Sequence, residues 1–239
     1  SGLVQLQKLS CRWNELDILD VTGSKKLTYL DCQGDQIQDL KFNGLKDLVH
    51  LDCRGVGPSV RCGTFLILDL EEYPNLTYLD CGYRSVGELK LNSLSKLEYL
   101  YCNHNALDNL DFDLLTNLKV FNCDYNSFYD LAILEMKNLQ SLSCQRNKLT
   151  SLDASNLQFL TDLNCDANSL NYLLLKNGKG IKNLSFDYNY DLAYICTDES
   201  EIEKVVKLPR KSFSINVNSY CTFTPGGSYY TVEGKSRVD

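Results

Sequence analysis

Apolar residues recur along the chain with a fixed spacing. A comb of cysteines steps through it in intervals of 21 residues, apart from one interval of 28. Its members are Cys11, Cys32, Cys53, Cys81, Cys102, Cys123, Cys144 and Cys165, and Phe186 occupies the next position. Apolar residues also precede each comb position by two places: Leu9, Leu30, Leu51, Leu79, Leu100, Phe121, Leu142, Leu163 and Leu184. Leucines, and finally Ile181, precede it by five.

A polar residue follows most comb positions three places later, and in five repeats in a row it is asparagine, from Asn105 to Asn189. Periods of 20 to 29 residues with this arrangement are the leucine-rich-repeat pattern. We expect the asparagine amide to bond to backbone groups where the chain turns after a strand.

This register predicts a short strand before each comb position, with alternate side chains pointing into the core. Stacked repeats then form a parallel concave sheet of about nine strands, spaced ~4.8 Å apart. Further apolar pairs, such as Leu19 and Val21 or Leu40 and Phe42, fill the core from the convex side. The linking segments are too short for long helices. The predicted fold is therefore a right-handed leucine-rich-repeat superhelix of the α/β type, with a convex side of extended chain and 3-10 turns.

The comb is interrupted between Cys53 and Cys81, where the segment GVGPSVRCG (55–63) inserts seven extra residues. Here Val56 and Arg84 replace the turn asparagine, and Cys62 lies within the insertion. We expect this loop to be held differently from the others.

Three segments are expected. Residues 1–196 form the solenoid of about nine repeats, 197–221 a capping helix and strand, and 222–239 a tail leading to a further domain. In the cap, Asp198 is the predicted N-cap and Glu201 the N3 residue. Ile202, Val205 and Val206 would cover the last repeat, and the helix should end before Pro209. Since the chain enters mid-repeat, we expect the native protein to be longer.

The charge balance excludes some partners. A net charge of −7 and a pI near 4.9 argue against nucleic acid, whose phosphates require a basic surface. There is no run of Lys or Arg for an anionic membrane surface. No apolar stretch approaches the ~20 residues of a membrane helix.

The cysteines admit three interpretations. A metal site would need clustered thiolates such as C-x₂-C pairs, which do not occur. Disulfides between comb neighbours are disfavoured because their in-register Cβ vectors are parallel. Buried free thiols are therefore the favoured interpretation. Cys196 and Cys221 lie outside the comb, and we predict a disulfide between them that closes the capping loop. Cys62 is expected to be unpaired.

Repeats such as LTYLDC (27–32) and LEYLYC (97–102) resemble the cysteine-ladder repeats of internalin-J-like bacterial surface proteins. The C-terminal YIC-TDES (194–200) and NSYCTFTPGGSYYTVEG (218–234) are similar to a module of secreted Bacteroidetes proteins. These resemblances imply an exported or cell-surface protein with a recognition or adhesion role. They bring no catalytic residues and no cofactor.

The register also identifies the residues of the concave face. Its N-terminal half gathers aromatic and acidic side chains: Tyr29, His50, Tyr78, Tyr99, Tyr101, Asp31, Asp52 and Asp80. Tyr83, His104 and Tyr125 follow at the strand exits. Exposed aromatic groups beside hydrogen-bonding groups are typical of protein and carbohydrate sites. The alternative is that the tyrosines only stabilise the sheet by cross-strand stacking. The neighbouring aspartates repel one another, which solvation, Arg12 and Arg54, or a bound Ca²⁺ could relieve.

We therefore expect a non-catalytic recognition module, monomeric, that binds a protein or carbohydrate through its concave face outside the cell. The two histidines lie in no catalytic motif. The alternatives are a rigid stalk that displays other domains, or a targeting module for a neighbouring enzyme.

Overall fold

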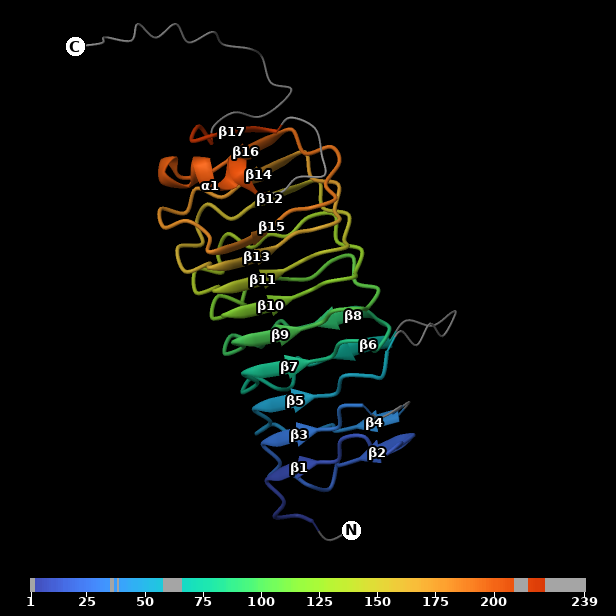
Figure 1. Cartoon of the computed structure of the whole chain (residues 1–239). Coiled ribbons are helices and arrows are strands. Elements are labelled where there is room, and N and C mark those ends of the chain that lie inside the picture. Colours follow the sequence, from blue (N-terminus) through green and yellow to red (C-terminus); the bar gives the residue numbers. More distant parts are fainter. Residues whose placement is uncertain (1–2, 35–36, 38, 58–65, 209–214, 222–239) are drawn as a thin grey trace, which may run out of the picture.

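The computed structural model describes residues 3–34, 37, 39–57, 66–208 and 215–221. The chain coils into a solenoid in which each turn adds one strand to a long parallel sheet (Figure 1). In spatial order the nine strands are β1 (Lys8–Ser10), β3 (Tyr29–Asp31), β5 (His50–Asp52), β7 (Tyr78–Asp80), β9 (Tyr99–Tyr101), β10 (Val120–Asn122), β11 (Ser141–Ser143), β13 (Asp162–Asn164) and β15 (Asn183–Ser185). The predicted leucine-rich-repeat solenoid is confirmed.

The strands pair in the register that the comb predicts. Leu9 lies opposite Leu30, and Leu30 opposite Leu51. The pairing continues across the interruption, where Leu51 lies opposite Leu79. Each of these leucines is the middle residue of a three-residue strand, so its side chain points into the core while its neighbours point outward.

Leucine and cysteine rows form one continuous core. Leu30, Leu79, Cys81 and Cys123 are fully buried. Burial of apolar area at about 25 cal/mol per Å² is the main term that stabilises such a stack. The first turn is more open, because Leu6, Leu9 and Cys11 are only partly buried.

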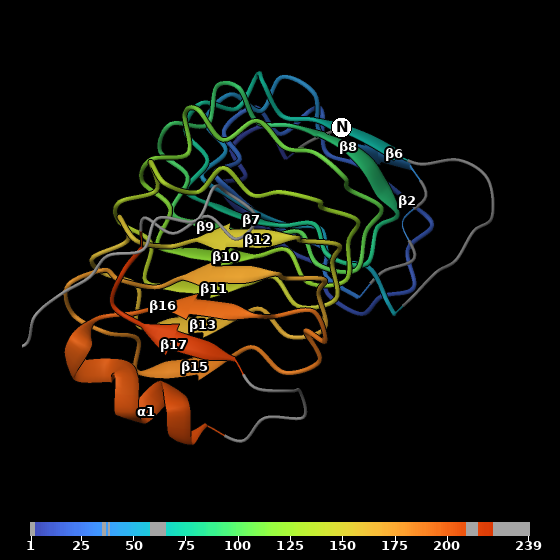
Figure 2. The same ribbon diagram turned by 90° about the horizontal axis from the view of Figure 1, so that it is seen from above.

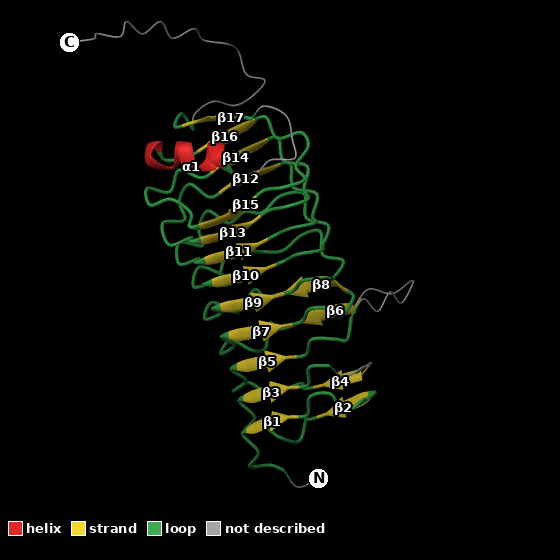
Figure 3. Ribbon diagram, viewed as in Figure 1, coloured by secondary structure: helices red, strands yellow, loops and turns green. Residues whose placement is uncertain are grey.

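The other side of the coil carries short strands rather than helices (Figure 3). They are β2 (Ile18–Asp20), β4 (Asp39–Lys41), β6 (Leu66–Asp69), β8 (Val86–Lys90), β12 (Ser151–Asp153), β14 (Tyr172–Leu174), β16 (Tyr194–Cys196) and β17 (Asn216–Asn218). They form separate sheets, β2-β4, β6-β8 and β12-β14-β16-β17. The extended chain that the sequence predicts on the convex side is therefore present. The strands β4 and β6 are not paired with each other.

The C-terminal end is covered by a 3-10 helix, η1 (Glu199–Glu201), and a helix, α1 (Ile202–Lys207) (Figure 2). The Asp198 carboxylate makes no cap hydrogen bond. It accepts from the Gly178 N–H instead, at 3.1 Å. Asp198 therefore stands at the predicted N-cap position, but its side chain does not cap the helix. Val205 is buried against the last repeats and Val206 is half exposed. Pro209 lies outside the described residues.

A disulfide joins Cys196, at the end of β16, to Cys221, with the Cα atoms 5.2 Å apart. β17 is held in the same place by parallel pairing with β16. The eight comb cysteines are free thiols, and all except Cys11 are buried. Cys62 and the predicted tail 222–239 lie outside the described residues.

Candidate functional site

The turn after each strand is built on its asparagine. The Asn147 amide donates to the carbonyls of Cys144 and Cys123, each at 3.0 Å, and its Oδ1 accepts from the Phe128 N–H at 3.1 Å. Asn126 and Asn168 make the same bonds one repeat earlier and one repeat later. Each asparagine therefore ties its own turn to the preceding repeat, as the sequence predicts.

The residue before the asparagine slot takes a left-handed backbone conformation in every repeat except the third, where Gly55 does not. We call these positions the exit row: Trp13, Gly34, Gly55, Tyr83, His104, Tyr125, Arg146, Ala167 and Tyr188. Tyr83, His104 and Tyr125 have φ values of 58°, 55° and 54°. This region costs a non-glycine residue roughly 1–2 kcal/mol. It persists here because each N–H still bonds to the next repeat, as His104 does to the Asp124 carbonyl at 2.8 Å.

The aromatic side chains of β3, β5, β7 and β9 form a continuous stack, which we call the sheet array: Tyr29, His50, Tyr78, Tyr99 and Tyr101. The His50 ring lies between those of Tyr29 and Tyr78, at centroid distances of 4.2 and 4.1 Å. The Tyr78 ring continues to Tyr99 at 6.2 Å and Tyr101 at 5.7 Å. The sheet spacing holds these rings at stacking distance without any ligand.

A second stack runs along the exit row and is called here the exit array. The His104 ring lies between Tyr83 and Tyr125, at 4.1 and 4.0 Å. Guanidinium groups cover both ends, since Arg54 lies over the Tyr83 ring at 5.0 Å and Arg146 over the Tyr125 ring at 5.2 Å. The costly left-handed positions thus present a rigid row of planar groups to solvent.

The predicted aspartates lie beneath the sheet array rather than on its surface. Asp31, Asp52 and Asp80 are only 1%, 4% and 5% exposed. Each accepts a hydrogen bond from the N–H two residues later, Asp80 from Gly82 at 2.9 Å and Asp52 from Arg54 at 3.1 Å. They therefore end their strands in the manner of an Asx turn.

Arg12 relieves part of the repulsion in this row. Its guanidinium pairs with Asp31 and lies 3.9 Å from Asp52. Tyr29 also donates its hydroxyl to Asp31 at 3.2 Å. Among the described residues, no group of three or more His, Cys, Asp or Glu side chains is arranged to hold a metal ion.

Burial changes the protonation of this region. Desolvation raises the pKa of Asp52 to about 6 and also raises the pKa of Asp80. Desolvation lowers the pKa of His50, whose Nε2 is buried without a hydrogen-bond partner in the described part of the chain. Neutral forms are favoured because few waters reach these groups.

The C-terminal half of the concave face is polar. Asp124 accepts from the Ser143 hydroxyl at 2.7 Å and from the Gln145 side chain at 3.0 Å. A shallow hollow of about 570 Å³ lies over β11, β13 and β15, with Leu208 at its edge. Its serine, asparagine and aspartate side chains offer no aromatic anchor.

The structure brings the five predicted aromatic residues together, while the three aspartates are buried and accept backbone N–H groups at the strand ends. The sequence missed the exit row as a unit, and with it Trp13, which is 65% exposed with φ 56°. The indole ring lies against Gly34, where an added Cβ would come within 2.3 Å of it. The sequence did contain a signal for this row, because each of its residues stands two places after a comb position.

Solved structures with the same fold are bacterial leucine-rich-repeat proteins. The functional domain of InlJ from Listeria monocytogenes, which includes a cysteine ladder, is 25% identical with a TM-score of 0.59. The match covers 82% of this chain and 44% of that one, so the present chain spans less than half of its length. A leucine-rich-repeat protein of Leptospira interrogans is 20% identical with a TM-score of 0.59, over 90% of this chain and 67% of that one, and supports the fold alone.

No protein-family model matches the sequence, and no curated protein matches it. Within the described residues, no helix has the length and apolar character needed to cross a membrane. The Listeria domain includes a cysteine ladder, and the present chain carries a row of eight free cysteines at one position of its repeat.

Proposed function

We propose that this leucine-rich-repeat solenoid is a non-catalytic recognition module whose concave face binds a partner protein through the sheet array and the exit array. The main observation in support is that the aromatic rings over β3 to β9 are already stacked on one another in the absence of a partner. Rings that are already fixed lose little entropy on binding, which favours affinity. Tyrosine and arginine are also the residues that dominate protein interfaces.

Ring orientation favours a protein over a carbohydrate. A sugar packs its C–H groups against an open aromatic face, which carries the negative part of the ring quadrupole. Both faces of His50 and His104 are covered by neighbouring tyrosines, and the outer faces of Tyr83 and Tyr125 carry arginines. At these four rings the available groups are ring edges, hydroxyls and guanidinium groups, which suit the mixed surface of a protein.

The same contacts support a binding role over an enzymatic one. Both histidines are held in stacks, and burial lowers the pKa of each, so neither is free to approach a substrate as a mobile acid or base. A solenoid that served only as a stalk would need no aromatic residues at left-handed positions, where a small residue costs less.

We also propose that the protein is located outside the cell or on the cell surface. The disulfide between Cys196 and Cys221 is stable in an oxidising compartment and rare in the cytosol. The neighbours from Listeria and Leptospira do not bear on the Bacteroidetes origin, which stays a prediction from the C-terminal segment.

The test is to probe arrays of purified secreted proteins, ectodomains and glycans with the labelled full chain. We expect a protein partner whose affinity falls at least about tenfold with the combined changes Tyr78→Ala and Tyr99→Ala. The matched control is Tyr129→Ala with Tyr190→Ala, two exposed tyrosines outside both arrays. Equal loss in both variants, or binding to glycans alone, contradicts the proposal.

A further inference from the structure

The sheet on the convex side is interrupted at the long repeat. β4 pairs with β2, and β6 pairs with β8, but none of the described strands lies between β4 and β6. In an unbroken solenoid these two would be neighbours, since they belong to successive repeats. The 28-residue interval between Cys53 and Cys81 accounts for the break.

Backbone groups of β6 face this gap. Leu66 and Leu70 donate their N–H groups to Ser85 and Lys90, on the β8 side, at 3.0 and 3.1 Å. Since successive residues of a strand point their backbone groups to opposite sides, the N–H and C=O groups of Ile67 and Asp69 are directed into the gap.

The edge of β4 is the counterpart. Val21 donates to the Lys41 carbonyl at 2.9 Å, so Lys41 faces β2 and its neighbours Leu40 and Phe42 face the gap. The Phe42 carbonyl accepts the Tyr73 hydroxyl at 3.3 Å, which is consistent with this direction. Two parallel strand edges therefore face each other across a space that no described strand fills.

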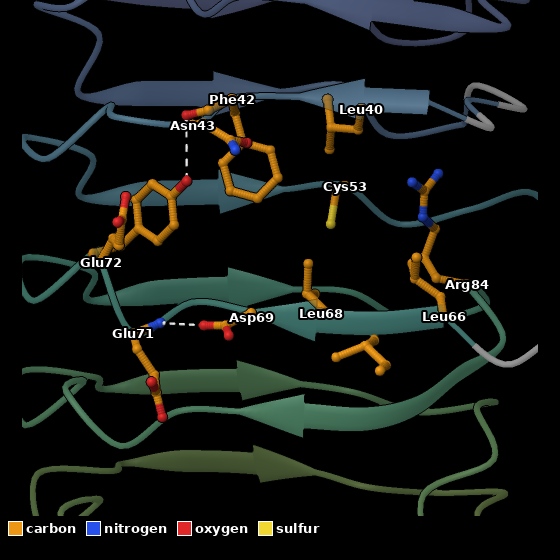
Figure 4. Close-up of a pocket in the computed structure, with 12 residues that line it drawn as sticks. Leu40, Phe42, Asn43, Cys53, Leu66, Leu68, Asp69, Glu71, Glu72 and Arg84 are labelled. Carbon is orange, nitrogen blue, oxygen red and sulfur yellow. Dashed lines mark hydrogen bonds between the residues drawn. The ribbon is translucent and has the colours of Figure 1, made fainter.

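That space is a cavity of about 560 Å³ lined by both apolar and charged side chains (Figure 4). Leu40 and Phe42 line one wall, Leu66 and Leu68 the other, and the Cys53 thiol lies between them. Leu66 is 41% exposed. Apolar surface that is exposed in a recess is typical of a binding site.

The two ends of the cavity carry opposite charges. Glu71 and Glu72 lie beyond the C-terminal end of β6, and Arg84 lies beside its start (Figure 4). The Arg84 guanidinium donates to the Ile37 carbonyl at 3.0 Å and so spans from the fourth repeat to the second. The positive end of the gap lies at the start of β6 and the negative end lies beyond its last residue. A bound segment with the opposite order of charges would therefore run parallel to β6.

We propose that this gap is a docking site for an extended peptide segment of a partner protein, which enters as a parallel strand between β4 and β6. Strand addition at exposed edges takes its affinity from main-chain hydrogen bonds and its specificity from alternate side chains. The bound segment carries apolar side chains at alternate positions, an acidic residue near its start beside Arg84, and Lys or Arg near its end beside Glu71 and Glu72.

A peptide fits better than a small apolar molecule. A compact ligand would contact the leucines, yet would not reach all the backbone groups of Ile67, Asp69 and Leu40 that face the gap along its length. An added strand satisfies both edges together, because a strand alternates its own N–H and C=O groups between its two sides.

The experiment selects binders to the full chain from a phage-displayed library of random ten-residue peptides, and measures synthetic versions by fluorescence anisotropy. We expect selected peptides with alternating apolar residues and a basic C-terminal half. N-methylation of adjacent central amides should weaken them at least about tenfold, since each removed N–H faced β4 or β6.

Two variants locate the site. Ile67→Pro removes a donor directed into the gap and leaves the Leu66 and Leu70 bonds to the β8 side in place. Glu71→Lys with Glu72→Lys reverses the acidic end without altering a strand. Each should weaken the peptide at least about tenfold, whereas the exposed control pair Asp108→Lys with Glu135→Lys leaves its affinity unchanged.

The inference is overturned if no peptide is selected, or if selected peptides tolerate N-methylation. Binding that ignores both variants, or self-association of the chain in place of peptide binding, also overturns it. The peptide library and the protein array are separate measurements, so failure here leaves the proposed role of the concave face standing.

Discussion

At the scale of single residues, burial separates framework from surface. Asp31, Asp52 and Asp80 share one row with Tyr101, but only the tyrosine keeps a partly exposed side chain. Tyr29 of the neighbouring row donates its hydroxyl to one of the aspartates, Asp31, at 3.2 Å. The carboxylates of all three serve the strand ends, where each accepts a backbone N–H.

The comb thiols show the same effect of desolvation. Burial raises the pKa of Cys53 to about 12, and it raises the pKa of Cys81 and Cys123 as well. Thiolates are the reactive species, so these cysteines resist oxidation although the chain also contains a disulfide. Free and bonded cysteines can therefore coexist in one oxidising compartment.

Substitution of a turn asparagine should be costly. Asn147→Ala removes the partner of the carbonyls of Cys123 and Cys144 and of the Phe128 N–H, all of them buried. We expect the free energy of unfolding to fall by at least about 2 kcal/mol in urea titrations followed by circular dichroism. Asn109→Ala, at an exposed position, should change it by less than about 0.5 kcal/mol. Equal effects would show that the asparagine ladder does not hold the turns.

Neutralising Asp52 should stabilise the protein at neutral pH. Its folded-state pKa of about 6 lies above the ordinary 3.8, so the folded chain binds more protons between these values. The stability that protonated Asp52 contributes is complete below about pH 4 and is lost as the pH rises through about 6.

Asp52→Asn should therefore raise the free energy of unfolding at pH 7 by roughly 2 kcal/mol, and the gain over the native chain should vanish towards pH 4. Parallel urea titrations at both pH values measure it, with Asp108→Asn as an exposed control. A gain that is the same at both pH values would contradict the assignment.

At the scale of elements, the C-terminal cap depends on its covalent link. Replacing Cys196 and Cys221 by Ala should lower the free energy of unfolding by about 2–4 kcal/mol, because a link across 25 residues restricts the unfolded chain. Loss of β17 should come first, seen as faster amide exchange over 216–218. Peptide mapping after alkylation in denaturant, without reductant, should leave both native cysteines unlabelled. Labelling of both would refute the bond.

The comb determines where the strands of the long sheet lie, because one cysteine every 21 residues fixes both spacing and side-chain direction. It cannot determine what covers a side chain that points outward, and so the burial of Asp31 was not foreseen. The separation of β4 from β6 was not foreseen either, since the spacing of the cysteines does not say where a 28-residue repeat places its convex strand. The sequence placed the N-cap correctly at Asp198 but not its side-chain hydrogen bond, because the carboxylate accepts from Gly178 of the preceding repeat instead of from the helix.

At the scale of the whole molecule, one chain presents two different surfaces. The concave face carries stacked rings that are rigid before binding. The convex side carries three short sheets, and a gap with charged ends lies between the first two of them. Both follow from repetition, since stacking places identical positions side by side and a single long repeat interrupts them.

The position of the partner on this surface is the central claim. Hydroxyl-radical footprinting of the chain with and without the partner found on the protein array measures it residue by residue. We predict that oxidation of Tyr78, Tyr99, Tyr101 and Tyr125 falls in the complex, while that of Tyr129 and Tyr190 does not change. Unchanged oxidation of the first four, with protection of Tyr129 or Tyr190, would contradict the account.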